Sequence, residues 1–188
     1  MGNDEQLTID LGVPVERTEW GKWVDPERRA AQVRKFLDRA GFSALPPEPW
    51  DFESGEAVQI SDMIVEMLPD VEAITLPENS DIVDQLVCFI GECFTRYLDA
   101  RWLDLTDMPP GYNDCEGESI YDDIRPGVAF KFEDWNTCTA ELLVRFVVER
   151  EFIALLELVS VAFWRLRKDG APFFSDLGAD FPGYPPFM

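Results

Sequence analysis

The sequence contains no histidine among its 188 residues, and it has few cations. Without histidine, this chain alone has no means of building a Ser-His-Asp triad, a Cys-His pair, a zinc site that uses histidine or a histidine-ligated haem. Lys and Arg number 16 against 37 Asp and Glu, which gives a formal net charge of −21. The composition therefore excludes several classes of enzyme, and the acidic charge is its first positive signal.

Motifs for cofactors and metals are also missing. The sequence has neither the G-x-x-x-x-G-K-[ST] nor the G-x-G-x-x-G pattern of nucleotide sites, and it lacks the cations that phosphate contacts with nucleic acid require. The four cysteines form no C-x-x-C pair, and we expect reduced thiols, three of them in apolar surroundings. They are Cys88, Cys93, Cys115 and Cys138. We expect no catalytic residue, no cofactor, no bound metal and no nucleic-acid partner.

No segment predicts membrane insertion or export. The longest apolar-rich stretch, residues 152–164, is interrupted by Glu157 and is too short to cross a bilayer. Residues 1–5 have neither the basic start nor the apolar run of a secretory signal. We therefore expect a cytoplasmic protein without a membrane partner.

The acidic charge is concentrated in the middle of the chain. Residues 40–124 hold twenty acidic residues and two basic ones, Arg96 and Arg101, for a net charge of −18. A merely solvated surface and an electrostatic field that attracts a basic partner both explain this pattern. Concentrating one sign of charge adds repulsion that mixed signs would avoid, which is an argument for the second explanation.

The hydrophobic pattern predicts one helix-rich domain. With 46% apolar and 13% aromatic residues, the composition supplies a packed core. Helical spacing and capping residues predict helices over residues 26–40, 55–68, 81–99 and 137–168, the last with a break at residues 149–151. The first helix is basic, and we expect it to dock on the protein's own acidic middle, with Ala30, Val33, Leu37 and Ala40 as its apolar stripe.

A small antiparallel sheet is expected between the last two helices. The pattern predicts strands at residues 101–105, 119–124 and 128–133, with a type II turn at residues 125–128. The fold class is therefore α+β, a single domain over residues 1–188 with the sheet in the middle. We expect an irregular N-terminal arm at residues 1–24 and an aromatic C-terminal segment at residues 171–188 that lies over the core.

Residues 82–128 contain three short features in sequence. They are Ile90-Gly91-Glu92 with Phe94 and Arg96, then Ala100-Arg101-Trp102, and then Pro126 after an acidic loop. Together these features resemble a helix-then-strand element of uncharacterised bacterial proteins, some of which are similar to toxin-immunity proteins. The resemblance implies a cytoplasmic bacterial α+β protein and transfers no catalytic residue.

The same residues also have a physical interpretation. Gly91 allows another element to approach the helix closely, and Trp102 is expected to anchor the core. Glu92 is spaced to meet Arg96 one helical turn later. All three interpretations are structural rather than catalytic.

Three functions from different classes follow. The leading one is a non-enzymatic acidic binding protein that neutralises a basic protein partner, as an immunity or inhibitor protein of a bacterial toxin does. A nucleic-acid-mimicking inhibitor of a DNA- or RNA-binding protein is the second, and a carboxylate-based hydrolase is the third. We expect six acidic residues at the rim of the partner surface: Asp107, Asp114, Glu116, Glu118, Asp122 and Asp123.

Overall fold

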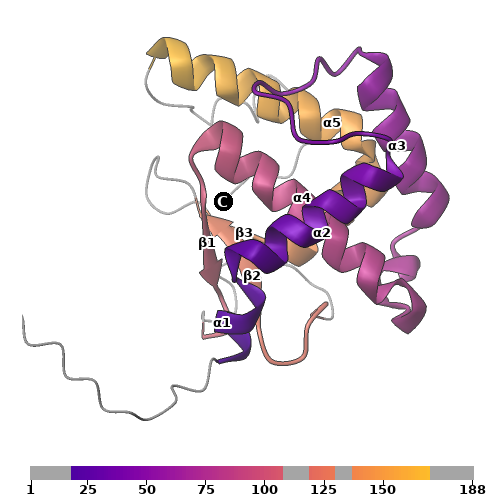
Figure 1. Ribbon diagram of the computed structural model, residues 1–188, viewed down its shortest axis with the longest axis vertical. Coiled ribbons are helices and arrows are strands. Elements are labelled where there is room, and N and C mark those ends of the chain that lie inside the picture. The colour runs from indigo at the N-terminus through magenta and orange to yellow at the C-terminus, as the bar shows by residue number, and fades with distance from the viewer. Residues whose placement is uncertain (1–17, 108–118, 130–136, 170–188) are drawn as a thin grey trace, which may run out of the picture.

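The computed structural model describes residues 18–107, 119–129 and 137–169. These residues form a helix-rich α+β domain with a small antiparallel sheet, as the sequence predicts (Figure 1). The helices are α1 (Glu19–Trp23), α2 (Pro26–Arg39), α3 (Gly55–Met67), α4 (Ser80–Leu98) and α5 (Ala140–Asp169), with two 3₁₀ turns, η1 (Glu72–Thr75) and η2 (Pro77–Asn79), before α4. The strands are β1 (Arg101–Asp104), β2 (Pro126–Ala129) and β3 (Thr137–Thr139).

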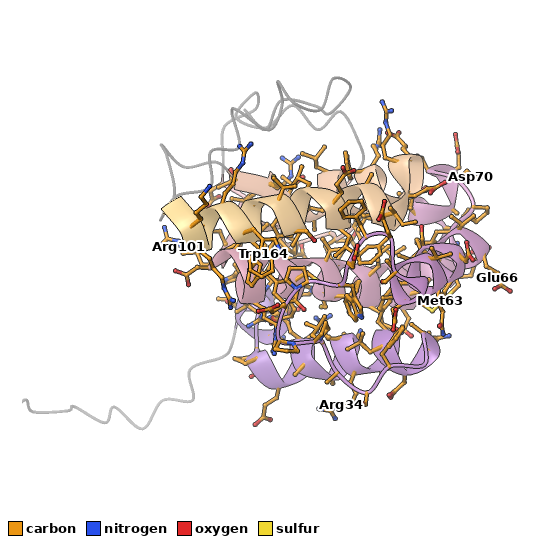
Figure 2. The ribbon with its side chains drawn as sticks, turned by 90° about the horizontal axis from the view of Figure 1, so that it is seen from above. Arg34, Met63, Glu66, Asp70, Arg101 and Trp164 are labelled. Atoms are coloured by element: carbon orange, nitrogen blue, oxygen red, sulfur yellow. The ribbon has the colours of Figure 1, made fainter. Side chains whose placement is uncertain are left out.

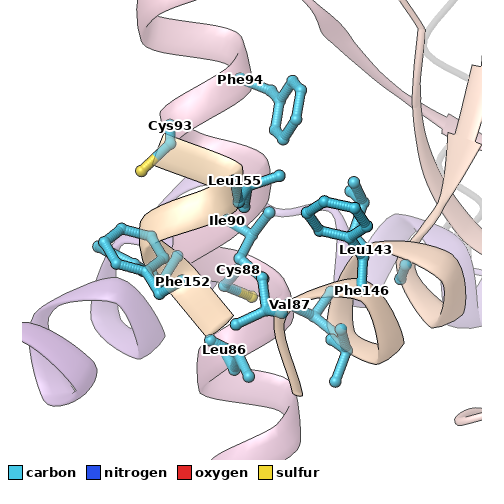
Figure 3. Packing of buried hydrophobic residues seen from close by; sticks show 14 of the residues in the cluster. Leu86, Val87, Cys88, Ile90, Cys93, Phe94, Leu143, Phe146, Phe152 and Leu155 are labelled. Carbon is cyan, nitrogen blue, oxygen red and sulfur yellow. The ribbon is translucent and has the colours of Figure 1, made fainter. Parts of the chain in front are cut away.

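Helix α4 is the centre of the molecule. Thirteen of its nineteen residues are buried, because apolar side chains cover most of its circumference. Helix α2 packs on one side of α4 and α5 on the other, so that three helical layers follow one another (Figure 2). Figure 3 shows Ile90 and Phe94 of α4 packed among residues of α5 such as Phe146, Phe152 and Leu155.

The helix ends follow the capping residues in the sequence. The Asp25 carboxylate accepts hydrogen bonds from the backbone N–H groups of Glu27 and Arg28, and Pro26 occupies the first turn of α2. Ser54 caps α3 in the same way. Gly41 has a φ of 80°, a conformation that favours glycine, and it directs the chain away from the end of α2.

Helix α5 consists of two helices joined at a kink, at the break predicted for residues 149–151. Glu151 has a φ of 71° and a ψ of 152°, far from helical values. The charged run Glu149-Arg150-Glu151 is exposed at this point. Phe146 and Phe152, on the two sides of the kink, are both buried, so the change of direction keeps both helices on the core.

The sheet differs from the prediction in three places. Residues 120–123 form bends rather than a strand, and residues 126–129 form β2 rather than the predicted type II turn. The part of the third predicted strand from residue 130 onward lies outside the described residues. Strand β2 lies between β1 and β3 and is antiparallel to both. Residues 137–139 pair with β2 as β3, so the last helix begins at residue 140. Cross-strand pairing, which local spacing does not encode, decides the positions of β2 and β3.

Two expectations for the N-terminal half also need correction. Within the arm that was expected to be irregular, residues 19–23 form the short helix α1, in which Trp20 and Trp23 stack with ring centroids 5.7 Å apart. On α2, Ala30 is exposed and Phe36 is buried instead. Residues 1–17 and the predicted aromatic C-terminal segment, residues 171–188, lie outside the described residues.

No helix among the described residues is both long enough and apolar enough to span a bilayer.

Candidate functional site: a buried aspartate, a cavity and an exposed acidic surface

Helix α2 turns part of its basic side toward α4. Val33, Phe36 and Leu37 in its C-terminal half are buried in the core, whereas Arg28 and Arg29 in its first turns reach acidic residues of α4. One face of this helix is therefore apolar at one end and cationic at the other. The prediction that the basic helix docks on the acidic middle of the chain is confirmed.

Asp84 is the residue at which these contacts converge. It lies in the second turn of α4 and is only 7% exposed. Its Oδ1 accepts hydrogen bonds from Trp23 Nε1 at 3.1 Å and Tyr121 Oη at 2.7 Å, and its Oδ2 accepts from Arg28 Nη2 at 2.6 Å and from Gln32 Nε2. Each oxygen thus has two donors, which fills the acceptor capacity of the carboxylate. Helices α1 and α2 and the segment 119–124 are all tied to α4 at this point.

These contacts set the charge states of the cluster. Burial alone would raise the pKa of Asp84, but the hydrogen bonds from Arg28, Gln32 and Tyr121 outweigh it and hold that pKa below its ordinary value. Burial and the negative charge of Asp84 raise the pKa of Tyr121 well above its ordinary value. At neutral pH the cluster therefore holds an ionised Asp84, a neutral Tyr121 and a charged Arg28.

A second ion pair joins the same two helices. Arg29 Nη1 of α2 donates to Glu92 Oε1 of α4, and the guanidinium lies 5.6 Å from the ring centroid of Trp102. The predicted Glu92–Arg96 pair is wrong, because Arg96 Nε instead donates to the carbonyl oxygen of Pro46 at 3.0 Å. Sequence spacing favours a partner one turn away, whereas the docked α2 brings Arg29 closer.

The expected close approach at Gly91 is confirmed. A Cβ atom placed on Gly91 would lie 1.9 Å from the Trp102 ring, so only glycine leaves room for the indole. Trp102 also packs edge-on against Trp23, with ring centroids 5.0 Å apart. The two tryptophans link the sheet and α1 to α4.

A cavity of about 500 Å³ opens beside the Asp84 cluster. Its lining contains four acidic and two basic side chains together with aromatic and aliphatic surface. The lining residues are Glu19, Lys22, Trp23, Arg28, Asp84, Tyr121, Asp122, Asp123 and Ile124. Asp122 and Asp123 are exposed.

The six residues predicted for the partner surface divide into three groups. Asp122 and Asp123 lie together at the cavity, on the segment that positions Tyr121. Asp107 is exposed after β1 but does not line the cavity. Asp114, Glu116 and Glu118 lie outside the described residues.

The largest group of exposed acids lies elsewhere, on and around α3. Eight acidic residues between residues 51 and 78 are all exposed, and among the described residues none of them forms an ion pair. They are Asp51, Glu53, Glu56, Asp62, Glu66, Asp70, Glu72 and Glu78. We call them the α3 acidic surface. Figure 2 shows Glu66 and Asp70 pointing outward at this end of the molecule.

The prediction of site residues missed this surface, although the sequence contained a signal for it. No Lys or Arg occurs between Arg39 and Arg96. The sequence does not show that the arginines of α2 form ion pairs with α4 rather than with the acids of α3. Which acids are paired depends on which helices pack against each other in the fold.

Nucleophile and metal chemistry find little support among the described residues. Cys88, Cys93 and Cys138 are buried, and they form no disulfide with one another. Burial and the neighbouring Asp84 raise the pKa of Cys88 to about 12, so its reactive thiolate form is scarce at neutral pH. No group of three or more potential metal ligands occurs within the ranges that the structure describes.

Comparisons with protein-family models, with curated proteins and with solved structures found no match for this chain.

Proposed function

We propose that this protein is a non-enzymatic acidic binding protein that neutralises a basic protein partner, as an immunity or inhibitor protein of a bacterial toxin does. The α3 acidic surface carries the proposal. Eight exposed carboxylates without an ion-pair partner among the described residues repel one another, which adds free energy to the folded state. A cationic partner surface would relieve that repulsion on binding.

Internal pairing elsewhere in the domain supports this reading of the surface. Asp84 and Glu92 are paired with arginines of α2. Asp81 Oδ1 lies 3.6 Å from Lys35 Nζ. The chain therefore neutralises acids where helices pack together, and it supplies no described cation to the acids of α3. The cationic complement for that surface would come from another molecule.

The surface also offers apolar contact between its charges. Val58 and Val65 on α3 are 42% and 45% exposed, and they lie seven residues apart, on one side of the helix. In an interface, charged residues chiefly raise the association rate, whereas buried apolar side chains slow dissociation. A partner with cations around a small apolar centre would match both features.

Carboxylate-based hydrolysis has weaker support. A general acid needs a carboxyl group that holds a proton near neutral pH, and the pKa of Asp84 is shifted in the opposite direction. All four of its donors come from the protein itself, so the carboxylate has no acceptor position left for a substrate.

The test is to recover the partner and then measure how its binding depends on salt. The full chain, immobilised at low ionic strength, would be used to isolate a stoichiometric basic protein from the source cell. Its association rate with the pure protein should then fall steeply as sodium chloride is added, because exposed charges are screened beyond about 8 Å at physiological ionic strength. A flat salt dependence would contradict the proposal.

A competition arm separates the proposal from nucleic-acid mimicry. If the isolated partner binds duplex DNA or RNA, and that duplex displaces the acidic protein, the partner's nucleic-acid cleft is the target. If the partner is a toxin whose active site is blocked by the acidic protein, and duplex nucleic acid does not compete for binding, the result supports an immunity or inhibitor protein. Isolation of no basic protein under these conditions would overturn both.

A further inference from the structure

We propose that the cavity beside Asp84 is a receptor for a guanidinium group, with an arginine side chain of the basic partner as its natural occupant. That the arginine comes from a basic partner rests on the proposed function. That the cavity prefers a guanidinium group rests only on the residues that line it. Guanidinium binding and partner binding are therefore tested separately.

The charge of the lining favours a cation. Four acidic and two basic side chains line the cavity, which gives a net charge of −2. Both basic groups already have carboxylate partners in the wall, Lys22 with Glu19 at 2.5 Å and Arg28 with Asp84 at 2.6 Å. The excess charge therefore belongs to Asp122 and Asp123, which form no ion pair with any described residue.

The walls are also fixed in place, which lowers the cost of binding. Tyr121 is held by its hydroxyl to Asp84 at 2.7 Å, and its ring packs edge-on against Trp23 with centroids 5.6 Å apart. Ser119 Oγ donates to the backbone carbonyl of Tyr121 at 2.7 Å. The segment that carries Asp122 and Asp123 is thus anchored to the core by its neighbour in sequence. A preformed site loses less conformational entropy when a ligand binds.

A guanidinium suits this lining better than an ammonium. It is planar, it forms paired hydrogen bonds with carboxylates, and it lies well against aromatic rings and aliphatic surface. The cavity offers two adjacent carboxylates, the Tyr121 ring and the Ile124 side chain. Arg28 already shows this mode of contact within the protein, since its guanidinium bonds to Asp84 and lies 5.2 Å from the Trp23 ring centroid. A volume of about 500 Å³ accommodates an arginine side chain.

The test uses a small probe in place of the partner. Agmatine presents a guanidinium on an aliphatic chain, and its urea analogue has the same shape without the guanidinium charge. Each would be titrated into the full-length isotope-labelled protein while the amide signals of residues 121–124 and the indole N–H signal of Trp23 are followed by NMR. We expect saturable shifts at these signals with agmatine and none with the urea analogue.

Two matched double variants show whether agmatine contacts the cavity carboxylates directly or is attracted only by the overall negative charge of the protein. The double variant Asp122→Asn/Asp123→Asn should weaken agmatine binding by about tenfold, because it removes two exposed ion pairs. The double variant Asp70→Asn/Glu72→Gln removes the same charge at positions outside the cavity and should change binding less than about twofold. All four positions are exposed, so both variants should keep the fold.

Four results would each overturn the inference. They are no binding of agmatine, equal shifts with the urea analogue, equal weakening in both double variants, and saturable shifts confined to residues outside the cavity. If a basic partner binds the protein while agmatine does not, this inference fails and the proposed function stands. If agmatine binds as expected while no basic partner is recovered, the cavity is a guanidinium site and the proposed function fails.

Discussion

Carboxylates have opposite environments at the α2–α4 interface and on the α3 acidic surface. At the interface, Asp84 is buried and Glu92 is partly buried, and they are paired with Arg28 and Arg29. On and around α3, eight acids face water without an ion-pair partner among the described residues. The difference shows that the net charge of the chain does not predict the role of a given carboxylate. The packing of the helices determines which acids form stabilising ion pairs and which stay exposed to solvent without one.

The comparison predicts large stability effects at the interface and small ones on the α3 surface. Asp84→Asn should lower the free energy of unfolding by about 3 kcal/mol, because it leaves the partly buried charge of Arg28 without its counterion. Asp62→Asn makes the same chemical change at an exposed position and should stay within about 0.5 kcal/mol of the wild type. Urea unfolding of the three proteins measures both effects, and equal losses would refute the distinction.

Two glycines provide a second pair of substitutions, one in the core where α4 meets Trp102 of β1 and one on α3. Gly91→Ala should destabilise the protein by about 2 kcal/mol, since the added Cβ would overlap the Trp102 ring. Gly55→Ala, at the first residue of α3, meets nothing within 4 Å and should be neutral or slightly stabilising. Thermal melts of both variants test this. A destabilised Gly55→Ala would show that α3 is more constrained than its exposure indicates.

A third prediction concerns the acid sensitivity of the interface. The pKa of Asp84 is lower in the folded protein than its ordinary value of 3.8, so ionised Asp84 stabilises the fold fully above that value. This stabilisation is lost as the pH falls below about 4 and through the folded-state pKa. The stability gap between the wild type and Asp84→Asn should therefore be constant from about pH 7 to pH 5 and narrow below about pH 4.

Unfolding free energies measured for both proteins across this pH range provide the test. Asp62→Asn serves as the control, and its gap to the wild type should stay small throughout. A gap for Asp84→Asn that widens as the pH falls from 7 to 5 would mean that the folded-state pKa of Asp84 is raised, contrary to the structure.

The sequence predicted the helices well because their signals are local. Caps such as Asp25 and Ser54, the apolar periodicity of α4 and the charged break before Glu151 all act within a few residues of where they appear. The strands were harder, since β2 and β3 exist through pairing between segments that are distant in sequence. The bends at residues 120–123 place the Tyr121 hydroxyl within hydrogen-bond distance of Asp84, a contact that no local sequence pattern predicts.

The candidate site was predictable only in part. The acidic region and the residues Asp122 and Asp123 could be identified from charge alone. The convergence of Trp23, Arg28 and Tyr121 on Asp84 could not, because these residues come from three segments that only the tertiary fold brings together. For the same reason, an acid that is central to the core looked like any other acid in the sequence.

We propose that the acids on and around α3 form no ion pairs with the rest of the domain that the structure describes and are therefore available to attract a basic partner. The decisive measurement is the association rate of that partner with the wild type and with the variant Asp62→Asn/Glu66→Gln/Asp70→Asn/Glu72→Gln at low ionic strength. We expect an association rate at least about tenfold lower for the variant, with an unfolding free energy unchanged or slightly higher because charge repulsion is relieved. An unchanged association rate, or a variant that is markedly less stable, would contradict the proposal.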